Sequence, residues 1–300
     1  MKSASPATLR GPACRCTMDD ALMDSQSRFA TITALNIYPV KSCAGTSLQR
    51  ARLTAAGFEH DRQWMIVRPN GRFVTQRELP RLALVRPALN DGSLQLHAPH
   101  IEPVSIDIEH GGANVDVVVW KDQCKAIDAG DVIARWLERF IGEPLRLVRF
   151  DPTFKRVADR AWTGDLTAFA QFSDGFPWLL ISQASLAALN AKLPKPLPMN
   201  RFRPNIVIDG VAPFEEDVLE QLSNDRVTLR PAKPCTRCAI TTTSQETGER
   251  DGEEPLRTLR TFRFDAALRG VAFGQNVILA QGVGEWLEVG QQLRVTARSG

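Results

Sequence analysis

The chain is read most directly from one stretch, Lys233-Pro234-Cys235-Thr236-Arg237-Cys238-Ala239-Ile240-Thr241-Thr242-Thr243. Its two thiols flank a Thr-Arg pair, after an apparent strand at Val227–Arg230 and before a run of β-branched residues. A thiolate is both a strong nucleophile and a soft metal ligand. Three nearby cations would favour the ionised form of either thiol and attract an anion: Arg230, Lys233 and Arg237. The stretch therefore predicts a site for a negatively charged ligand.

Length and composition indicate a two-domain protein of a reducing, cytoplasmic setting. The sequence has 300 residues, 43% of them hydrophobic, and a formal net charge of +3, which leaves room for two hydrophobic cores. Its arginines are spread along the chain, so no nucleic-acid partner is expected. The six cysteines do not form the disulfide framework of a small secreted protein. No long apolar run predicts a membrane helix or a signal peptide.

The first half of the chain is rich in short strand patterns. A disordered tail is expected at 1–28, because it is rich in Ser, Ala and Arg. Alternating segments then predict strands at 31–38, 47–54, 63–68, 72–76, 82–89, 93–97, 104–108 and 115–120. Asn70-Gly71 and Asp91-Gly92 are typical hairpin turns. Short strands at this spacing predict a barrel or a sandwich.

The second half mixes helices and strands. An apolar stripe at helical spacing predicts a helix at Asp131–Ile141, ended by Gly142. A strand at 145–150 precedes a long loop at 151–176, and loops of that length are often functional. Ser182 is expected to cap a helix at 183–193. Further elements are expected as strands at 178–181, 206–208, 277–280 and 292–297, and as a helix at 254–262.

Five segments occur in a particular order along the chain. They are Ile37–Gly45 (IYPVKSCAG), Asp61–Met65 (DRQWM), Gln76–Leu82 (QRELPRL), Phe202–Asn205 (FRPN) with the Cys-x-x-Cys and its threonines, and Phe273–Asn276 (FGQN). Together they resemble the MOSC family, the superfamily of the molybdenum-cofactor sulfurase C-terminal domain, and most closely its bacterial and mitochondrial amidoxime-reducing branch. The resemblance implies a mainly β fold with some α structure (α+β). It consists of an N-terminal MOSC β-barrel-like domain at 29–150 and a MOSC β-barrel domain with a few helices at 151–300.

The resemblance also implies a cofactor and a set of residues that hold it. The family binds a molybdenum cofactor, a pterin dithiolene that carries a phosphate, and its metal takes one protein thiolate. The match places that thiolate, the metal ligand and catalytic residue, at Cys238, with Cys235 as its neighbour. The cofactor-binding residues implied by the matching motifs are Lys41, Ser42, Arg62, Arg203, Asn205, Gln275 and Asn276. Arginine forks suit phosphate and pterin edges, and a lysine acts as a point charge.

One position departs from the family pattern. Relatives commonly carry Asp-Pro after the paired threonines, whereas this sequence has Ser244-Gln245 after Thr243. If that carboxylate orients a ligand, the local geometry or proton supply differs here. If it is a turn residue, serine replaces it without loss.

The activity implied by the resemblance is reduction of N-hydroxylated compounds, such as hydroxylaminopurines and amidoximes, to amines or amidines and water. The sequence carries no Cys-x4-Cys-x2-Cys spacing for an iron–sulfur cluster, so electrons are expected from a separate ferredoxin-like protein or flavin reductase. A monomer is expected. The alternative is a non-catalytic carrier or sulfur-transfer module for the cofactor. Pyridoxal phosphate is kept as a further ligand to be tested.

A lone Cys-x-x-Cys also has two simpler interpretations. Zinc would need two more ligands, and all four histidines lie in the N-terminal half without ligand spacing. A thioredoxin-like dithiol usually opens a helix, whereas a β-branched run follows here. Cys43 and Cys124 are expected to be buried thiols. Only the joint occurrence of the cysteines with Lys41, Arg62 and Arg203 favours the cofactor site.

Overall fold

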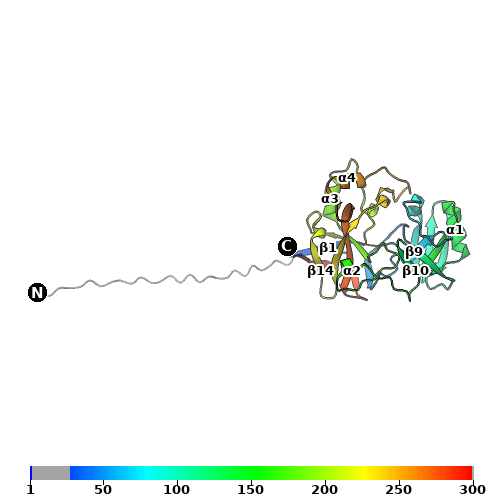
Figure 1. Ribbon diagram of the computed structural model, residues 1–300, viewed down its shortest axis with the longest axis horizontal. Helices are drawn as coiled ribbons and strands as arrows, with labels where there is room; N and C mark the ends of the chain where they lie inside the picture. The colour runs from blue at the N-terminus through cyan, green and yellow to red at the C-terminus, as the bar shows by residue number, and fades with distance from the viewer. Residues whose placement is uncertain (2–27, 299–300) are drawn as a thin grey trace.

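A closed barrel of seven strands dominates the computed structural model, which describes Met1 and residues 28–298 (Figure 1). Around the barrel the strands are β12 (Trp178–Ser182), β13 (Ile206–Asp209), β1 (Arg28–Ile37), β19 (Gln292–Ala297), β14 (Leu219–Ser223), β15 (Thr228–Thr236) and β17 (Gly270–Gln281). A second pairing of β17, with β12, closes the ring. β12 and β13 run parallel, and the other neighbours are antiparallel.

The first described strand of the chain belongs to this barrel. β1 pairs with β13 on one side and with β19 on the other. Ala30, Ile32 and Leu35 of β1 are fully buried and pack in the barrel core. Strands from both predicted domains, 29–150 and 151–300, therefore pair in one sheet. The domain boundary near residue 150 stays a prediction. Residues 2–27 of the expected tail lie outside the described residues, whereas Arg28 begins β1.

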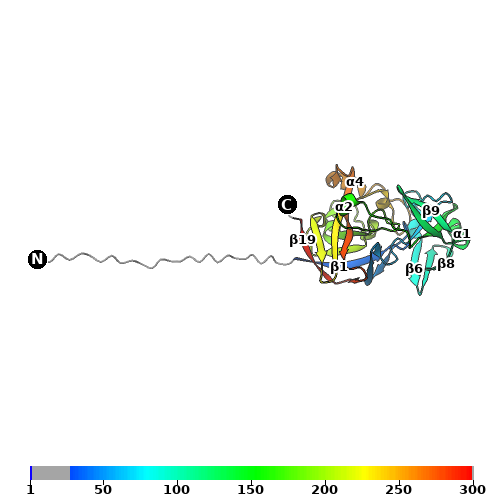
Figure 2. The ribbon, with the colours of Figure 1, turned by 60° about the horizontal axis from the view of Figure 1, so that its bottom comes forward.

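Two further sheets stand beside the barrel (Figure 2). One has the order β5 (Trp64–Val67), β11 (Arg146–Phe150), β10 (Asp122–Asp128) and β9 (Asn114–Val119). The other consists of β6 (Arg86–Asn90), β7 (Ser93–Ala98) and β8 (Ile101–Asp107). Short strands lie at the junction with the barrel: β2 (Thr46–Leu48), β3 (Arg50–Thr54), β4 (Gly57–Phe58) and β18 (Trp286–Glu288), while β16 (Phe264–Asp265) extends β17.

The four α-helices of the described residues cover these sheets. α1 (Asp131–Ile141) has the predicted bounds and buries Ile133, Trp136, Leu137 and Phe140, and Gly142 ends it in the left-handed region. α3 (Gln183–Asn190) begins after Ser182, whose hydroxyl accepts from the Ser185 N–H, so the predicted cap is confirmed. α3 and α4 (Leu256–Phe262) share a core with β12 and β17 (Figure 1). α2 (Arg160–Thr163) is a single turn within the long loop.

Some local predictions were wrong for identifiable reasons. The strand expected at 82–89 begins only at Arg86, because residues 80–84 form a 3-10 helix. Pro80 favours that helix, since it fixes a helical φ and has no N–H to give to a sheet. Residues 72–76 were expected to form a strand, but they make only isolated β-bridges. β10 was missed because its inward residues are small or polar, Cys124, Ala126 and Asp128. Within the described residues, no helix is long and apolar enough to cross a membrane.

Gly45 allows a test of how tightly the chain packs against the Tyr38 ring. A Cβ at this position would lie 2.4 Å from Cε1 of Tyr38 and 2.8 Å from its Cδ1, and the Tyr38 ring is buried. Gly45→Ala should therefore lower the free energy of unfolding by about 1–3 kcal/mol, as overpacking does elsewhere. Gly111→Ala is the matched control, because its Cβ would meet nothing within 4 Å. Urea unfolding measures both; equal effects would contradict the close approach.

Candidate functional site

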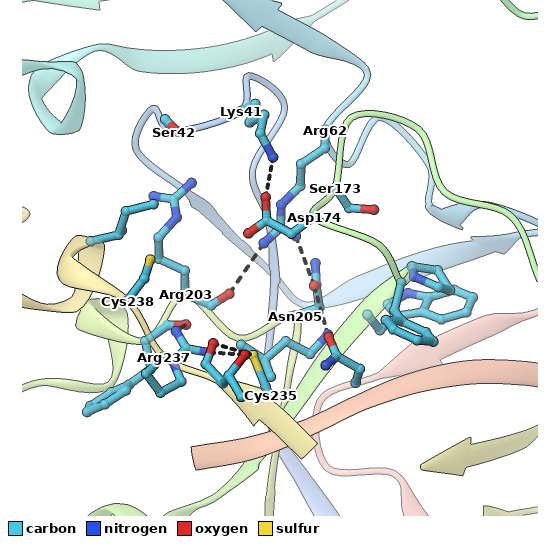
Figure 3. A pocket seen from close by; sticks show the side chains of 18 of the residues that line it. Lys41, Ser42, Arg62, Ser173, Asp174, Arg203, Asn205, Cys235, Arg237 and Cys238 are labelled. Atoms are coloured by element: carbon cyan, nitrogen blue, oxygen red, sulfur yellow. Dashed lines mark hydrogen bonds and ion pairs between the residues drawn. The ribbon is translucent and has the colours of Figure 1, made fainter. Parts of the chain in front are cut away.

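A pocket lies where the barrel meets the N-terminal sheets, and it collects side chains from distant parts of the sequence (Figure 3). Its walls come from the turn after β1, the end of the long loop, the segment before β13, and the two cysteines with their neighbours. The lining residues are Lys41, Ser42, Arg62, Thr75, Ser173, Asp174, Phe176, Pro177, Trp178, Leu179, Phe202, Arg203, Asn205, Cys235, Thr236, Arg237, Cys238, Ile240 and Asn276.

The structure brings together all but one of the residues predicted for the site. Those that line the pocket are Lys41, Ser42, Arg62, Arg203, Asn205, Asn276 and Cys238. Gln275 does not line it. Successive side chains of a strand point to opposite faces, and the Gln275 amide donates to Asp217 Oδ1 at 2.7 Å. Gln275 therefore supports β17 behind the wall in this structure.

Two guanidinium groups flank one tyrosine ring. The guanidinium carbon of Arg62 lies 4.3 Å from the Tyr38 ring centroid, and that of Arg203 lies 4.2 Å from it. Burial raises the pKa of the Tyr38 hydroxyl to about 12, against the opposing effect of the two arginines. Burial, together with the charge of Arg62, lowers the pKa of Arg203 to about 10. At neutral pH, Arg62 and Arg203 line the pocket as cations, and the Tyr38 hydroxyl stays protonated and uncharged.

Partners fix the orientation of each arginine. Arg62 Nη1 donates to both oxygens of Asp61, at 2.8 and 2.6 Å, and to Asn205 Oδ1 at 2.9 Å. Arg203 Nη1 donates to the carbonyl of Cys43 at 2.6 Å. Arg62 thus has a full carboxylate partner, whereas Arg203 has only neutral acceptors among its described contacts. The pocket consequently holds an excess of positive charge.

Three of the predicted residues have unusual backbone conformations. Ser42, Arg62 and Arg203 have φ values of 66°, 48° and 57°, in the left-handed region that few residues other than glycine adopt. Such strain persists where the surrounding structure over-determines it, and it is frequent at functional sites. Here it turns two arginine side chains toward a shared tyrosine.

Sequence reasoning missed Asp174, which pairs with Lys41. Lys41 Nζ is buried and lies 2.5 Å from Asp174 Oδ1, whereas the carboxylate is 67% exposed, opening on the pocket. Partial desolvation at the pocket wall would raise the pKa of Asp174, but the Lys41 ammonium and a hydrogen bond from Trp120 outweigh it and hold that pKa below its usual range. Burial lowers the pKa of Lys41, and Asp174 opposes this effect. The only sequence signal for Asp174 was its place in the long loop.

A second missed residue, Arg156, holds the wall that carries Asp174. Its guanidinium is buried and pairs with Asp122 at 2.8 Å. It also donates to backbone carbonyls of the wall, those of Gln171 at 2.9 Å, Ser173 at 2.5 Å and Asp174 at 3.3 Å. Lys41 donates to the Phe172 carbonyl at 2.8 Å. Buried cations therefore bind every carbonyl from 171 to 174.

The two cysteines have different surroundings. Arg237 Nη1 lies 2.9 Å from Cys235 Sγ. Burial raises the pKa of the Cys235 thiol, and Arg237 only partly opposes this. Cys238 directly precedes the 3-10 helix Ala239–Thr242, which the β-branched run forms, and within the described residues its sulfur has no hydrogen-bond partner. Cys235 is thus held as a protonated thiol, while Cys238 faces the pocket free.

Two of the three cations expected around the thiols do not line the pocket. Lys233 Nζ lies 4.9 Å from the Trp162 ring centroid. Arg230 lies 3.7 Å from Asp165. Only Arg237 contacts a thiol. Besides Arg237, the positive charge of the pocket comes from Lys41, Arg62 and Arg203, which are remote from the cysteines in sequence.

Ser244, the departure from the family pattern, is a turn residue. Its hydroxyl accepts from the N–H groups of Glu246 at 3.4 Å and Thr247 at 3.2 Å, and its carbonyl accepts from Gly248 N–H at 3.0 Å. It does not line the pocket. Of the two interpretations, the structure supports the turn.

Asn205 is bound on all sides by protein groups. Its Oδ1 accepts from Arg62 and from the Leu179 N–H, at 2.9 and 3.2 Å, and its Nδ2 donates to the Asn36 carbonyl at 3.1 Å.

Within the described residues, no three His, Cys, Asp or Glu side chains gather to hold a metal ion. A zinc ion held by protein ligands alone therefore has no support there.

Comparisons with known proteins identify the family of the chain. The model of the MOSC N-terminal beta barrel domain matches residues 29–144, and that of the MOSC domain matches residues 169–294. Mitochondrial amidoxime reducing component 2 of Rattus norvegicus is 36% identical over 246 residues, 78% of this chain and 72% of the relative. The human mitochondrial amidoxime-reducing component 1 is 35% identical over 245 residues, with the same coverage. The mouse component 1 is 33% identical over 260 residues, 84% of this chain and 76% of the relative.

The chain belongs to the MOSC family. The resemblance inferred from five short segments is thereby confirmed, and so is the mainly β, α+β fold class. Lys41 and Arg62 lie in the part matched by the N-terminal MOSC domain, and Arg203 and Cys238 lie in the MOSC domain. The pocket therefore takes residues from both family domains. Nothing in these comparisons supports pyridoxal phosphate as a ligand.

Asn205 offers a test that separates a supporting role from direct ligand binding. Asn205→Ala would leave the Leu179 N–H and an Arg62 N–H without their buried acceptor. Thermal and urea unfolding without any ligand should show a loss of about 2–4 kcal/mol, since each unsatisfied buried group costs about 1–3 kcal/mol. Asn200→Ala, at an exposed position, should change stability by less than about 0.5 kcal/mol. Unchanged stability of Asn205→Ala would show that its amide serves a ligand instead.

Proposed function

We propose that this MOSC protein is a molybdenum-cofactor-dependent oxidoreductase that reduces N-hydroxylated compounds to amines or amidines. In the balanced reaction, two electrons and two protons cleave the N–O bond and release water. The observation that carries the proposal is the Cys238 thiol, which has no hydrogen-bond partner among residues 28–298 and lies in a pocket with the cations Lys41, Arg62 and Arg203. The relatives named as amidoxime-reducing components support the same reaction.

The pocket fits an anionic, hydrogen-bonding group such as this cofactor. Three buried donors that line it lack any partner in the described residues: Ser173 Oγ, Trp178 Nε1 and Arg237 Nε. A buried donor without a partner is costly, so a bound ligand with acceptor atoms would satisfy what the protein leaves open. When bound, the molybdenum cofactor would supply the two-electron chemistry.

The side chains of the pocket would divide the work of binding. Lys41, Arg62 and Arg203 would hold anionic groups, Lys41 as a point charge and the arginines through their planar forks. Ser42, Asn276 and the unpartnered donors would add hydrogen bonds. Asn205 would act through Arg62, whose guanidinium it orients. Preorganised charge of this kind stabilises developing negative charge at low reorganisation cost.

Thiol chemistry favours Cys238 as the single metal ligand. A thiolate is the coordinating form of cysteine. The raised pKa of Cys235 keeps its proton on the sulfur at neutral pH, and Arg237 occupies that sulfur. Cys238 carries no such contact in the described residues. Cys235 then serves as a neighbour that helps to place Arg237.

Metal content of paired cysteine variants tests the ligand assignment. From cells that make the cofactor, Cys238→Ala should retain less than about a tenth of the wild-type molybdenum, because losing a ligand should cost at least the roughly 10- to 100-fold in metal affinity that losing a residue behind a ligand typically costs. Cys235→Ala should retain most of it. Plasma mass spectrometry of the purified proteins measures both. Equal losses from the two variants would overturn the choice of Cys238.

Viologen-driven reduction of an amidoxime or a hydroxylaminopurine tests the activity. The wild-type protein should turn over, and Cys238→Ala should not. Molybdenum without turnover would favour the carrier function over the reductase. Absence of molybdenum from protein made in cofactor-competent cells would overturn both.

A further inference from the structure

An exposed tryptophan lies directly outside the pocket. Trp120 occupies the tip of the β9–β10 hairpin, is 43% exposed and has a left-handed φ of 56°. Its indole Nε1 donates to Asp174 Oδ1 at 3.1 Å. Asp174 in turn pairs with Lys41 at the pocket wall. A single side chain therefore separates the exposed indole from the proposed cofactor site.

One cationic side chain stacks on this indole, and two exposed cations stand next to the indole or its aromatic neighbour in the sequence. The guanidinium carbon of Arg77 lies 4.4 Å from the ring centroid. Arg72 adjoins Phe73, whose ring meets Trp120 edge-on at a centroid distance of 5.1 Å. Lys121 follows Trp120 in the hairpin turn, and both Arg72 and Lys121 are exposed. We call these four residues, Trp120, Arg72, Arg77 and Lys121, the Trp120 surface.

The Trp120 surface has a net positive charge. Within residues 28–298, none of its three cations forms an ion pair, whereas neighbouring carboxylates are already neutralised. The pairs are Asp116 with Lys125, Asp122 with Arg156, and Glu78 with Arg68, which Glu143 shares. Arg250 also reaches this side and donates to the Arg77 carbonyl.

We propose that the Trp120 surface is the docking site of the electron donor, and that the donor is a redox protein with an acidic face. The inference rests on the proposed function, which requires electrons from a separate protein. Opposite charge steers two redox proteins together and fixes their orientation. Tryptophan and arginine are the residues that most often anchor an interface. Docking here would bring the donor's redox centre next to the pocket.

A second exposed tryptophan serves as the rival surface. Trp162 in α2 is 36% exposed, and Lys233 Nζ lies 4.9 Å from its ring centroid. Its neighbour Arg230 is paired with Asp165. Within the described residues the Trp162 indole makes no hydrogen bond to the pocket. The Trp162 surface therefore carries less free charge and has no bonded route inward.

The test compares a protein donor with a small one on the full-length, cofactor-loaded protein. Reduced plant-type [2Fe–2S] ferredoxin is the acidic protein probe, and reduced methyl viologen is the small donor. The double variant Arg77→Glu/Lys121→Glu should lower ferredoxin-driven turnover on the order of tenfold or more at low ionic strength, as charge reversal at a steering surface does. Viologen-driven turnover should stay within about twofold of wild type, since a small dye needs no docking surface.

Two matched controls exclude a general effect of charge. Arg135→Glu/Lys195→Glu makes the same charge change at exposed positions and should leave ferredoxin-driven turnover within about twofold of wild type. Lys233→Glu should do the same. If either control falls as far as Arg77→Glu/Lys121→Glu, or if that variant keeps the wild-type rate, the assignment of the docking site is wrong.

A binding measurement decides the matter independently of turnover. Titration of oxidised ferredoxin onto each protein should show weaker binding to Arg77→Glu/Lys121→Glu, and binding to wild type that weakens as salt is added. Wild-type protein that fails to bind ferredoxin at low salt would overturn the proposal. If viologen drives no turnover, the proposed function fails, while the titration still tests the surface.

Discussion

The site depends on one aromatic ring held between two guanidinium groups. Tyr38 follows the first barrel strand, Arg62 belongs to the N-terminal part, and Arg203 precedes β13, so this contact joins both parts of the molecule at the pocket. Two like charges so close repel one another, and Asp61 compensates only Arg62. The charge that remains on Arg203 makes the pocket attractive to an anion before any ligand arrives.

Around this contact, buried cations line the pocket and also hold the backbone of its wall in place. Arg156 and Lys41 bind four successive carbonyls of the wall at 171–174, and Arg62 donates to the Arg203 carbonyl at 3.4 Å. A wall built this way needs no regular secondary structure to be well defined. This explains how a long loop can present Asp174 at a fixed place opposite the cysteines.

Sequence reasoning identified the family, the helix α1 and seven of the residues that line the pocket, because these depend on local pattern or on short motifs. It did not find Asp174 or Arg156, whose roles arise only when the loop folds back onto β10. Gln275 was placed in the site because it shares a motif with Asn276, and strand alternation sends it to the other face. Strands β10 and β14 escaped notice because small and polar residues interrupt their apolar pattern.

The pairing of β1 with β19 sets the order of events during biosynthesis. The earliest barrel strand to leave the ribosome has to wait for the last one, since β19 completes the ring between β1 and β14. Until then the inner face of β1, with Ile32 and Leu35, lacks its full cover. The residues that line the pocket end at Asn276, yet the ring that supports them is complete only when β19 has paired with β1 and β14.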